Sequence, residues 1–328
     1  MCPATAGLRL VSVDDLRHRS VDIDPRDLVW VDLSQPTDED IAWLERTFHF
    51  HPVALEDVRL RHQRAKLDEY PDYYFGVLYA VRTDTVRHRV RTAELQFFWG
   101  ASYLVTLHAE PFPEIEHLAK RVRSDSLTPV VGDDTRQVSI GDLAYRLIDA
   151  VVDTYFPAVD AVAEWSEAIE AGMFAASRKP AQATLQALFT LKKDLLGLRK
   201  VIAPSRDVLN VLLRREHHLF GDDLQPYYQD VYDHTVRVID SLDTYRDLLA
   251  SALDTYLSVV SNDVSQTVKK MTAVTAILMV DALVAGIYGM NFDTIPELHW
   301  PYGYAWALGL MLVLSVGLWA LFRRIQWW

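Results

Sequence analysis

The chain has 328 residues, a formal charge of −12 at pH 7 and 50% hydrophobic residues. This length allows a sizeable core and more than one part. The acidic balance argues against nucleic-acid binding, because phosphate contacts need clustered Lys and Arg; cations are the more natural partners. The only cysteine, Cys2, cannot form an internal disulfide, which suits a reducing compartment.

Short apolar runs between polar turns characterise the chain up to about residue 130. They are rich in aromatic and β-branched residues, as strands are. Thr37, followed by acids, marks a helix start over 37–48. Because strands and helices interleave, we expect a cytoplasmic α/β domain over residues 1–135. The predicted strands are 28–33, 73–81, 95–100 and 103–108.

After Ile140 the pattern changes to long helical periodicity, which predicts a cytoplasmic helical hairpin region over 136–225. We expect interruptions at Pro157, Pro180, Pro204 and the stretch 220–226. From Pro226 to Gly286 no Pro or Gly intervenes, so nothing breaks a helix of about sixty residues, on the order of 90 Å. Its part over 226–270 is predicted to be a stalk.

Three rows of residues recur along the stalk at a spacing of seven. Two of them form a coiled-coil-like seam, and the third is acidic and lies on a different face. The acidic row is either a solvated surface or a stripe that attracts cations. The seam consists of Val231, Val238, Tyr245, Ala252 and Val259 with Thr235, Leu242, Leu249 and Tyr256; the acidic row consists of Asp233, Asp240, Asp247 and Asp254.

Two apolar runs, 271–288 and 304–322, are each long enough to cross a hydrocarbon core of about 30 Å. A buried helix of a soluble protein is the alternative for either one. Tryptophans flank the runs, and indole rings prefer the headgroup zone, so a membrane hairpin is favoured. We expect a first span at 271–290, an extracytoplasmic loop at 291–303, a second span at 304–322 and a basic tail at 323–328.

Charge predicts the orientation of this hairpin. Lys269 and Lys270 precede the first span, Arg323 and Arg324 follow the second, and the loop between them has no Lys or Arg. By the positive-inside rule both termini are cytoplasmic. The N-terminus has no apolar run of signal-peptide type. We therefore expect a multi-pass protein of the cell (inner) membrane.

Two spans cannot enclose an ion pathway, so either several chains gather their spans or the hairpin is only an anchor. Residues three or four positions apart along the first run share one face of a helix, and on this face they are small or apolar. Such a lining suits a narrow pore that resists wetting and has a polar mouth at Asn291. The predicted pore-lining residues are Val268, Met271, Thr275, Met279, Ala282 and Gly286.

Gly289, Met290 and Asn291 end the first of these two C-terminal runs and are followed by Pro-Glu-Leu and an aromatic loop. With this signature the chain resembles the CorA-type magnesium transporters. The resemblance extends to HPVALEDV, LRKVIAPSRDVLNVLLR and YYQDVYDHTVRVIDSLDTYRDLL. It implies an α+β membrane protein with an N-terminal cytoplasmic α/β domain, a long helical stalk and two C-terminal transmembrane helices. It also implies a homopentamer in the lipid bilayer that takes up divalent cations, Mg²⁺ first.

The resemblance implies roles for particular residues. Gly289, Met290 and Asn291 would form the selectivity filter, since Mg²⁺ dehydrates reluctantly and a ring of carboxamides can bind its waters. Asp293 and Glu297 would raise the local cation concentration.

On the cytoplasmic side, Asp230 matches a carboxylate that binds a regulatory divalent ion between subunits and gates transport. Its partner on the neighbouring subunit would be Asp84. Asp254 matches an acid near the cytoplasmic pore entrance.

The first span departs from the family where many relatives read Met-Pro-Leu-Thr and this chain reads Met279-Val280-Asp281-Ala282. An acid within a span is costly and a functional candidate. Helical spacing puts Asp281 about 100° from Ala282 and about 200° from Met279, beside the predicted pore face. It suits a hydrogen-bonded structural role as well as a cation or proton site, and it leaves Mg²⁺ versus Zn²⁺, Co²⁺ or Ni²⁺ open.

Other functions stay open. A proton-coupled zinc transporter of the ZntB-like branch, or a Co²⁺ or Ni²⁺ transporter, would share this architecture. A membrane-anchored sensor or structural oligomer would share the stalk without needing a polar pore mouth. We do not expect an enzyme, because the histidines form no spaced metal or triad motif with Cys or Ser.

Overall fold

The structure, a computed structural model, falls into two compact units, Met1–Ala250 and Ser251–Trp328. The description below covers residues 8–12, 28–61, 63–124, 126–131, 138–174, 182–214, 222–291, 297 and 300–327. The domain boundaries expected from the sequence remain predictions.

A mixed six-stranded sheet organises the first unit, in the order β1-β2-β6-β5-β4-β3. β1, β2 and β6 run parallel, whereas β3, β4 and β5 pair antiparallel with their neighbours. The predicted strands are present, and β4 and β5 extend beyond the predicted ranges into a long hairpin. The bounds are β1 (Leu8–Ser12), β2 (Leu28–Ser34), β3 (Lys66–Glu69), β4 (Tyr73–Asp84), β5 (Arg89–Gly100) and β6 (Tyr103–His108).

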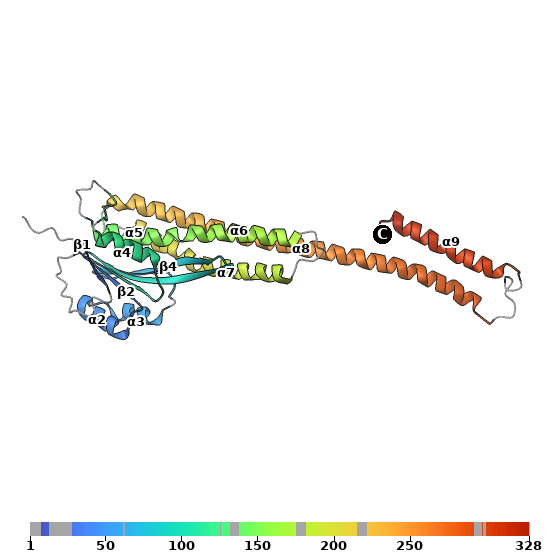
Figure 1. Cartoon of the computed structure of the whole chain (residues 1–328), viewed down its shortest axis with the longest axis horizontal. Coiled ribbons are helices and arrows are strands. Elements are labelled where there is room, and N and C mark those ends of the chain that lie inside the picture. Colours follow the sequence, from blue (N-terminus) through green and yellow to red (C-terminus); the bar gives the residue numbers. More distant parts are fainter. Residues whose placement is uncertain are drawn as a thin grey trace, which may run out of the picture. The chain divides into compact units, whose positions relative to one another are not determined.

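Helices cover both faces of this sheet (Figure 1). α2 (Asp38–Phe48) and α3 (Pro52–Leu60) lie on one face, and α4 (Pro113–Arg123) and α5 (Ile140–Asp153) lie on the other. The predicted helix start is correct, because Thr37 Oγ1 accepts from the amide of Asp40 at 3.3 Å. The Asp40 carboxylate in turn accepts from the Thr37 amide at 2.8 Å, which completes a capping box.

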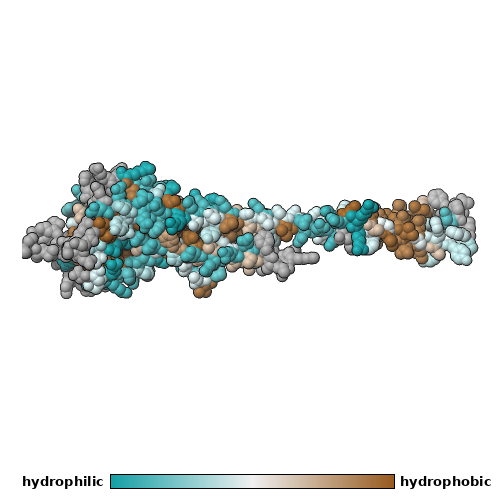
Figure 2. Space-filling model, turned by 90° about the horizontal axis from the view of Figure 1, so that it is seen from above, coloured by the Kyte–Doolittle hydropathy of each residue, from teal (hydrophilic) through white to brown (hydrophobic). Residues whose placement is uncertain are grey.

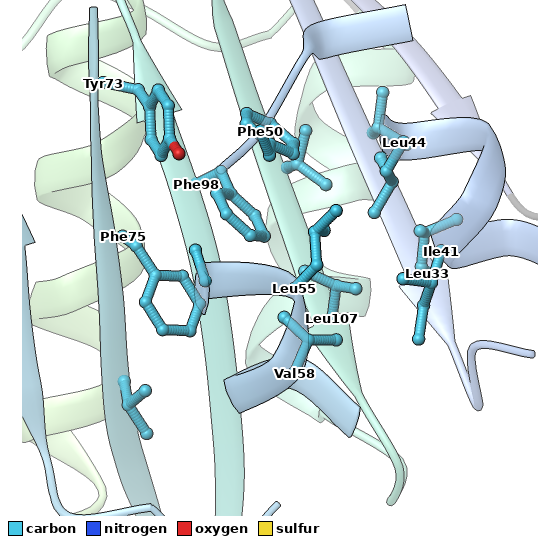
Figure 3. Packing of buried hydrophobic residues seen from close by; sticks show 14 of the residues in the cluster. Leu33, Ile41, Leu44, Phe50, Leu55, Val58, Tyr73, Phe75, Phe98 and Leu107 are labelled. Carbon is cyan, nitrogen blue, oxygen red and sulfur yellow. The ribbon is translucent and has the colours of Figure 1, made fainter. Parts of the chain in front are cut away.

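The core between the sheet and α2 and α3 is strongly aromatic (Figure 3). Alternate residues of each strand point to this face. The ring of Phe50 stacks on that of Phe98 with centroids 3.9 Å apart, and Phe75 lies 4.8 Å from Phe98. These rings are almost completely buried, so they fix α2 and α3 on the sheet.

The opposite face of β2 and β6 carries a polar chain. Thr106 Oγ1 donates to Asp32 Oδ1 at 2.7 Å, and His108 Nε2 lies 3.3 Å from the same oxygen. His108 Nδ1 lies 2.6 Å from the carbonyl oxygen of Glu110. Nδ1 is thus within hydrogen-bonding distance of a carbonyl oxygen, whereas Nε2 lies beside the carboxylate without forming a well-aligned hydrogen bond. Burial lowers the pKa of His108, but the Asp32 carboxylate and the Glu110 carbonyl outweigh it, so the pKa is raised above 6.5.

The tip of the β4–β5 hairpin is held by the two helices α6 (Tyr155–Phe174) and α7 (Gln182–Arg214). The ring of His88 stacks on Trp165 of α6 at 5.3 Å. The guanidinium of Arg89 makes two contacts of 2.9 and 3.1 Å with the carboxylate of Asp194, a buried residue of α7.

Prolines break the helices less often than expected. α5 ends at Asp153 and α6 begins at Tyr155, so the break precedes Pro157. The interruption predicted at Pro204 is wrong, because α7 continues through it. Proline removes one backbone donor, while the buried side chains of Ile202, Leu198 and Leu209 keep both halves of α7 packed. Pro180 lies outside the described residues.

A single helix of 64 residues, α8 (Gln225–Tyr288), follows a short 3₁₀ turn, as the absence of Pro and Gly between Pro226 and Gly286 predicts. Its part within the first unit packs on α5, α6 and α7. The Tyr145 and Tyr228 rings lie 5.6 Å apart, and Arg199 Nε donates to Asp243 at 2.7 Å. The seam is buried here by helices of the same chain, which leaves this part of it unavailable to a second copy. The buried seam residues are Val231, Thr235, Val238, Leu242 and Leu249.

The second unit contains the rest of α8 and α9 (Gly303–Arg324). Both helices are long and apolar enough to cross a membrane, and most of their apolar side chains are exposed in the single chain. Figure 2 shows apolar side chains gathered on this hairpin, whereas the surface of the first unit is mainly polar. The predicted fold class, with its α/β domain, long helix and two C-terminal apolar helices, is therefore present.

Candidate functional site

The C-terminal part of α8 has two unlike faces. Ala273 and Val284 are buried, because they lie on the side that α9 covers. The six residues predicted to line a pore are all exposed in the single chain and lie on the other side; Met271 is 72% exposed and Met279 67%. Helical spacing places these two sets on opposite sides of α8. The predicted row therefore forms one continuous face, and its role stays a prediction.

The Gly-Met-Asn signature lies where α8 ends. The Gly289 amide donates to the Ala285 carbonyl at 2.9 Å, and the Met290 amide donates to the Ile287 carbonyl at 3.3 Å. Asn291 follows outside the helix and is exposed. A Cβ at Gly289 would come within 3.1 Å of the Ala285 oxygen, so a residue without a side chain suits this tight turn. Asn291 is therefore accessible at the end of α8.

Of the two acids predicted to attract cations, Asp293 lies outside the described residues. Glu297 is partly buried, and its carbonyl accepts from the Trp300 amide at 3.2 Å. A Cβ at Gly303 would overlap this carbonyl oxygen, so only glycine fits where α9 begins.

Aromatic rings lie at both ends of α9. Near its start, Trp300 lies 6.2 Å from Trp306 and 6.4 Å from Tyr302, and all three are exposed. At its other end, the guanidinium of Arg323 lies 5.2 Å from the ring of Trp319. Such rings at both ends are typical of a helix that meets two membrane interfaces.

The acid within the first apolar run, Asp281, does not share the exposed face. It is partly buried beside α9, where Ser315 Oγ lies 2.9 Å from Oδ1 and 2.8 Å from Oδ2. Sequence reasoning missed Ser315. The sequence does contain a signal for it, because Ser315 is the only serine in the apolar run 304–322 and could partner the acid in the other run.

Asp230 lies at the start of α8, with Oδ1 3.7 Å from Nε2 of His234. Nearby α5 carries Asp149 and Asp153, which sequence reasoning also missed. Burial and the charge of Asp153 raise the pKa of Asp149 to about 6; Asp230 raises it further, and His234 and Arg146 lower it. The charges of Asp153 and Asp230 therefore both act on Asp149.

Asp84, the predicted partner of Asp230, ends β4 and caps the hairpin turn. Its Oδ1 accepts from the Arg87 amide at 2.9 Å, and Oδ2 lies 4.0 Å from Arg87 Nε. Within the described parts of the chain, no group of three or more His, Cys, Asp or Glu side chains is arranged to hold a metal ion. The pairing of Asp84 with Asp230 of a neighbour stays a prediction.

The acidic row of α8 is exposed along its length, and Asp254, the predicted residue of the pore entrance, is its last member. Two of its carboxylates have partners on the same helix, because Gln229 donates to Asp233 at 2.9 Å and Arg246 lies 2.9 Å from Asp247. In the single chain the row is a solvated acidic surface.

Comparison with known proteins gives concordant matches. The family model described as CorA-like Mg²⁺ transporter protein matches residues 25–324. YfjQ of Bacillus subtilis is 34% identical over 298 residues, which cover 91% of this chain and 89% of that protein. The cobalt/magnesium transport protein CorA of Thermotoga maritima is 31% identical, with coverage of 96% and 90%.

The fold agrees as well. The solved structure of the CorA magnesium transporter from Methanocaldococcus jannaschii has a TM-score of 0.80, with 94% of each chain covered and 24% sequence identity. The match of the family model over residues 25–324 and the coverage of these relatives show that the chain belongs to the CorA-like Mg²⁺ transporter protein family.

Proposed function

We propose that this chain forms a channel-like transporter for divalent cations, with Mg²⁺ as the main cargo, and that five copies assemble around the path. The exposed face of α8, which runs toward Asn291 on the side away from α9, carries this proposal. One hairpin cannot enclose a path, so each copy would contribute one such face to a ring. The relatives named cobalt/magnesium transport proteins support Mg²⁺ or Co²⁺ as cargo.

The chemistry of this face suits a path that stays dry until it opens. Its residues are small or apolar, and the hydroxyl of Thr275 already donates to the Met271 carbonyl at 2.8 Å. A lining without charge resists wetting. A ring of Asn291 carboxamides would contact the waters of a hydrated Mg²⁺ ion, which the ion gives up reluctantly. Asp293 and Glu297 would concentrate cations at this mouth.

Charge also sets the proposed orientation. Lys269 and Lys270 lie before the apolar part of α8, and Arg323 and Arg324 end α9. Both pairs would lie on the cytoplasmic side, so the α/β domain and both termini would be cytoplasmic.

Regulation is proposed to act through Asp230. The charges of Asp149 and Asp153 beside it make this surface favourable for a divalent cation, which would relieve their repulsion. Asp84 of a neighbouring copy would contribute a carboxylate after giving up its contact with Arg87. Intracellular divalent ion bound there would close the path, with Asp254 at its cytoplasmic entrance.

Purified protein in liposomes tests the proposal with Mg²⁺, Co²⁺, Ni²⁺ and Zn²⁺ in turn. Asn291→Ala should abolish flux while light scattering shows an intact oligomer, because the carboxamide contacts the hydrated ion and does not pack the fold. Asn262→Ala, at an exposed position of the same helix, is the matched control and should retain flux.

Unchanged flux in the Asn291→Ala variant would refute the proposed selectivity filter. Zn²⁺ flux that needs a proton gradient would favour the ZntB-like alternative. Absence of flux for every ion would favour a sensor or a structural oligomer.

A further inference from the structure

Two isolated polar side chains meet inside the membrane hairpin. Asp281 is the only acidic or basic residue of the run 271–288, and Ser315 is the only serine of the run 304–322. Although 34 positions separate them, Ser315 Oγ lies 2.8 and 2.9 Å from the two carboxylate oxygens. Each residue provides the other with a hydrogen-bonding partner in a region where water is scarce.

The packing of α8 shows which side this pair occupies. Val284, one turn from Asp281, is only 8% exposed, and Ala273 is fully buried. Both lie on the side of α8 that faces α9. Leu283 and Met279 are 63% and 67% exposed and point elsewhere. The carboxylate of Asp281 is thus directed at α9 and away from the exposed row.

The chemistry of the pair works in either protonation state. An ionised Asp281 can accept the single hydroxyl hydrogen of Ser315, shared between its two oxygens. A protonated Asp281 can donate to Ser315 Oγ, whose own hydrogen can then bond to a backbone carbonyl one turn earlier. In each state a donor of one residue meets an acceptor of the other, so the contact itself forms without a third partner.

We propose that Asp281 and Ser315 form a polar latch that fixes α9 against α8, and that Asp281 is a positioning residue instead of an ion ligand. The latch sets how the apolar part of α8 lies on α9 and thereby orients the opposite face of α8. Its effect on transport rests on the proposed function. The contact between the two helices is independent of the proposed function.

Substitutions at the two positions separate this role from that of a charge in the path. Asp281→Asn keeps a group that donates and accepts, so it should retain most flux, whereas Asp281→Leu should lose it. Ser315→Thr should be tolerated and Ser315→Ala should resemble Asp281→Leu. The exchanged pair Asp281→Ser with Ser315→Asp should recover flux. If Asp281 were an ion ligand, Asn would be as harmful as Leu and Ser315→Ala would be harmless.

A double-mutant cycle measures the contact without transport. Polar pairs between membrane helices change an unfolding equilibrium constant by about threefold to twentyfold. Asp281→Leu and Ser315→Ala should each lower the constant for folding in bicelles by a factor in this range. The double variant should be no worse than the more damaging single variant. If the double variant instead shows the product of the two single losses, the two side chains do not interact, and the latch is refuted.

Cysteine cross-linking gives a geometric readout. Cys2 is the only native cysteine, so Cys2→Ser provides a clean background. In it, Asp281→Cys with Ser315→Cys should form an intrachain disulfide in membranes, seen as loss of two maleimide labels from the monomer band. Leu283→Cys with Leu312→Cys, at two exposed positions, is the control and should form no intrachain bridge. Failure of the first pair would refute the latch, whereas wild-type protein without flux would refute only the proposed function.

Discussion

Replacing Asp149 by Asn should stabilise the protein at neutral pH. The carboxyl of Asp149 is partly buried on α5, and its pKa rises from the ordinary 3.8 to about 6. Burial is the main cause, followed by the charge of Asp153, with Asp230 adding to it. Asn has nearly the same shape but cannot ionise, so it removes the repulsion without leaving a cavity.

The sign follows from proton binding. Between about pH 4 and pH 6 the folded chain holds a proton on Asp149 that the unfolded chain has released, so stability falls as pH rises through this window. The shift corresponds to about 3 kcal/mol as an upper limit, at 1.36 kcal/mol per unit. Because Asp149 is only partly buried, solvent screening reduces the expected gain of the variant to about 1 kcal/mol above pH 6.

Thermal unfolding of the full chain in detergent, followed by tryptophan fluorescence in EDTA, checks this. Asp149→Asn should unfold at a higher temperature than wild type at pH 7.5, and the gain should vanish near pH 4. Asp160→Asn, at an exposed position of α6, is the matched control and should change nothing. Millimolar Mg²⁺ should shrink the gain if a cation binds beside Asp230. Equal gains at both pH values would refute the electrostatic reasoning.

Three further outcomes are expected. The stabilisation that His108 gains from Asp32 should be fully present below about pH 6.5 and be lost as pH rises above it, because the pKa of His108 is raised in the folded chain. A His108→Gln variant that loses as much stability as wild type between pH 6 and 9 would contradict this. Arg89→Ala should cost about 2 kcal/mol in urea unfolding, since it leaves the buried carboxylate of Asp194 without its charged partner and with only the Val90 amide as a donor; a loss under 0.5 kcal/mol, about the size of a surface effect, would argue against it. Millimolar Mg²⁺ should slow proteolysis of wild type but not of Asp230→Ala, and equal protection of both would count against the regulatory site.

The sequence was most informative where one short-range rule decides the structure. Aromatic and β-branched runs located β2, β4, β5 and β6, and Thr37 located the start of α2. The uninterrupted helix α8 followed from the absence of Pro and Gly between its two ends, Pro226 and Gly286. Each of these features depends on residues within a few positions of one another, so no knowledge of the packing was needed.

Features that depend on packing between distant segments were missed. Pro204 was expected to end a helix, but burial of the residues on either side of it keeps α7 continuous. The acids beside Asp230 come from α5, some eighty positions earlier in the chain. Helices of the same chain cover the coiled-coil-like seam of α8 up to Leu249, which the spacing of its residues alone does not show.

The two faces of α8 show how a periodicity and a packing argument combine. Helical spacing places Asp281 about 100° from Ala282, but this angle alone suits a residue of the path or a residue between helices. The contact with Ser315 puts Asp281 on the side of α9. Because α9 covers only that side, the exposed row from Met271 to Gly286 is left to face lipid or further copies of the chain. Further copies of α8 would cover it and would bring one Asn291 each to the same mouth, which is the geometry that the proposed filter requires.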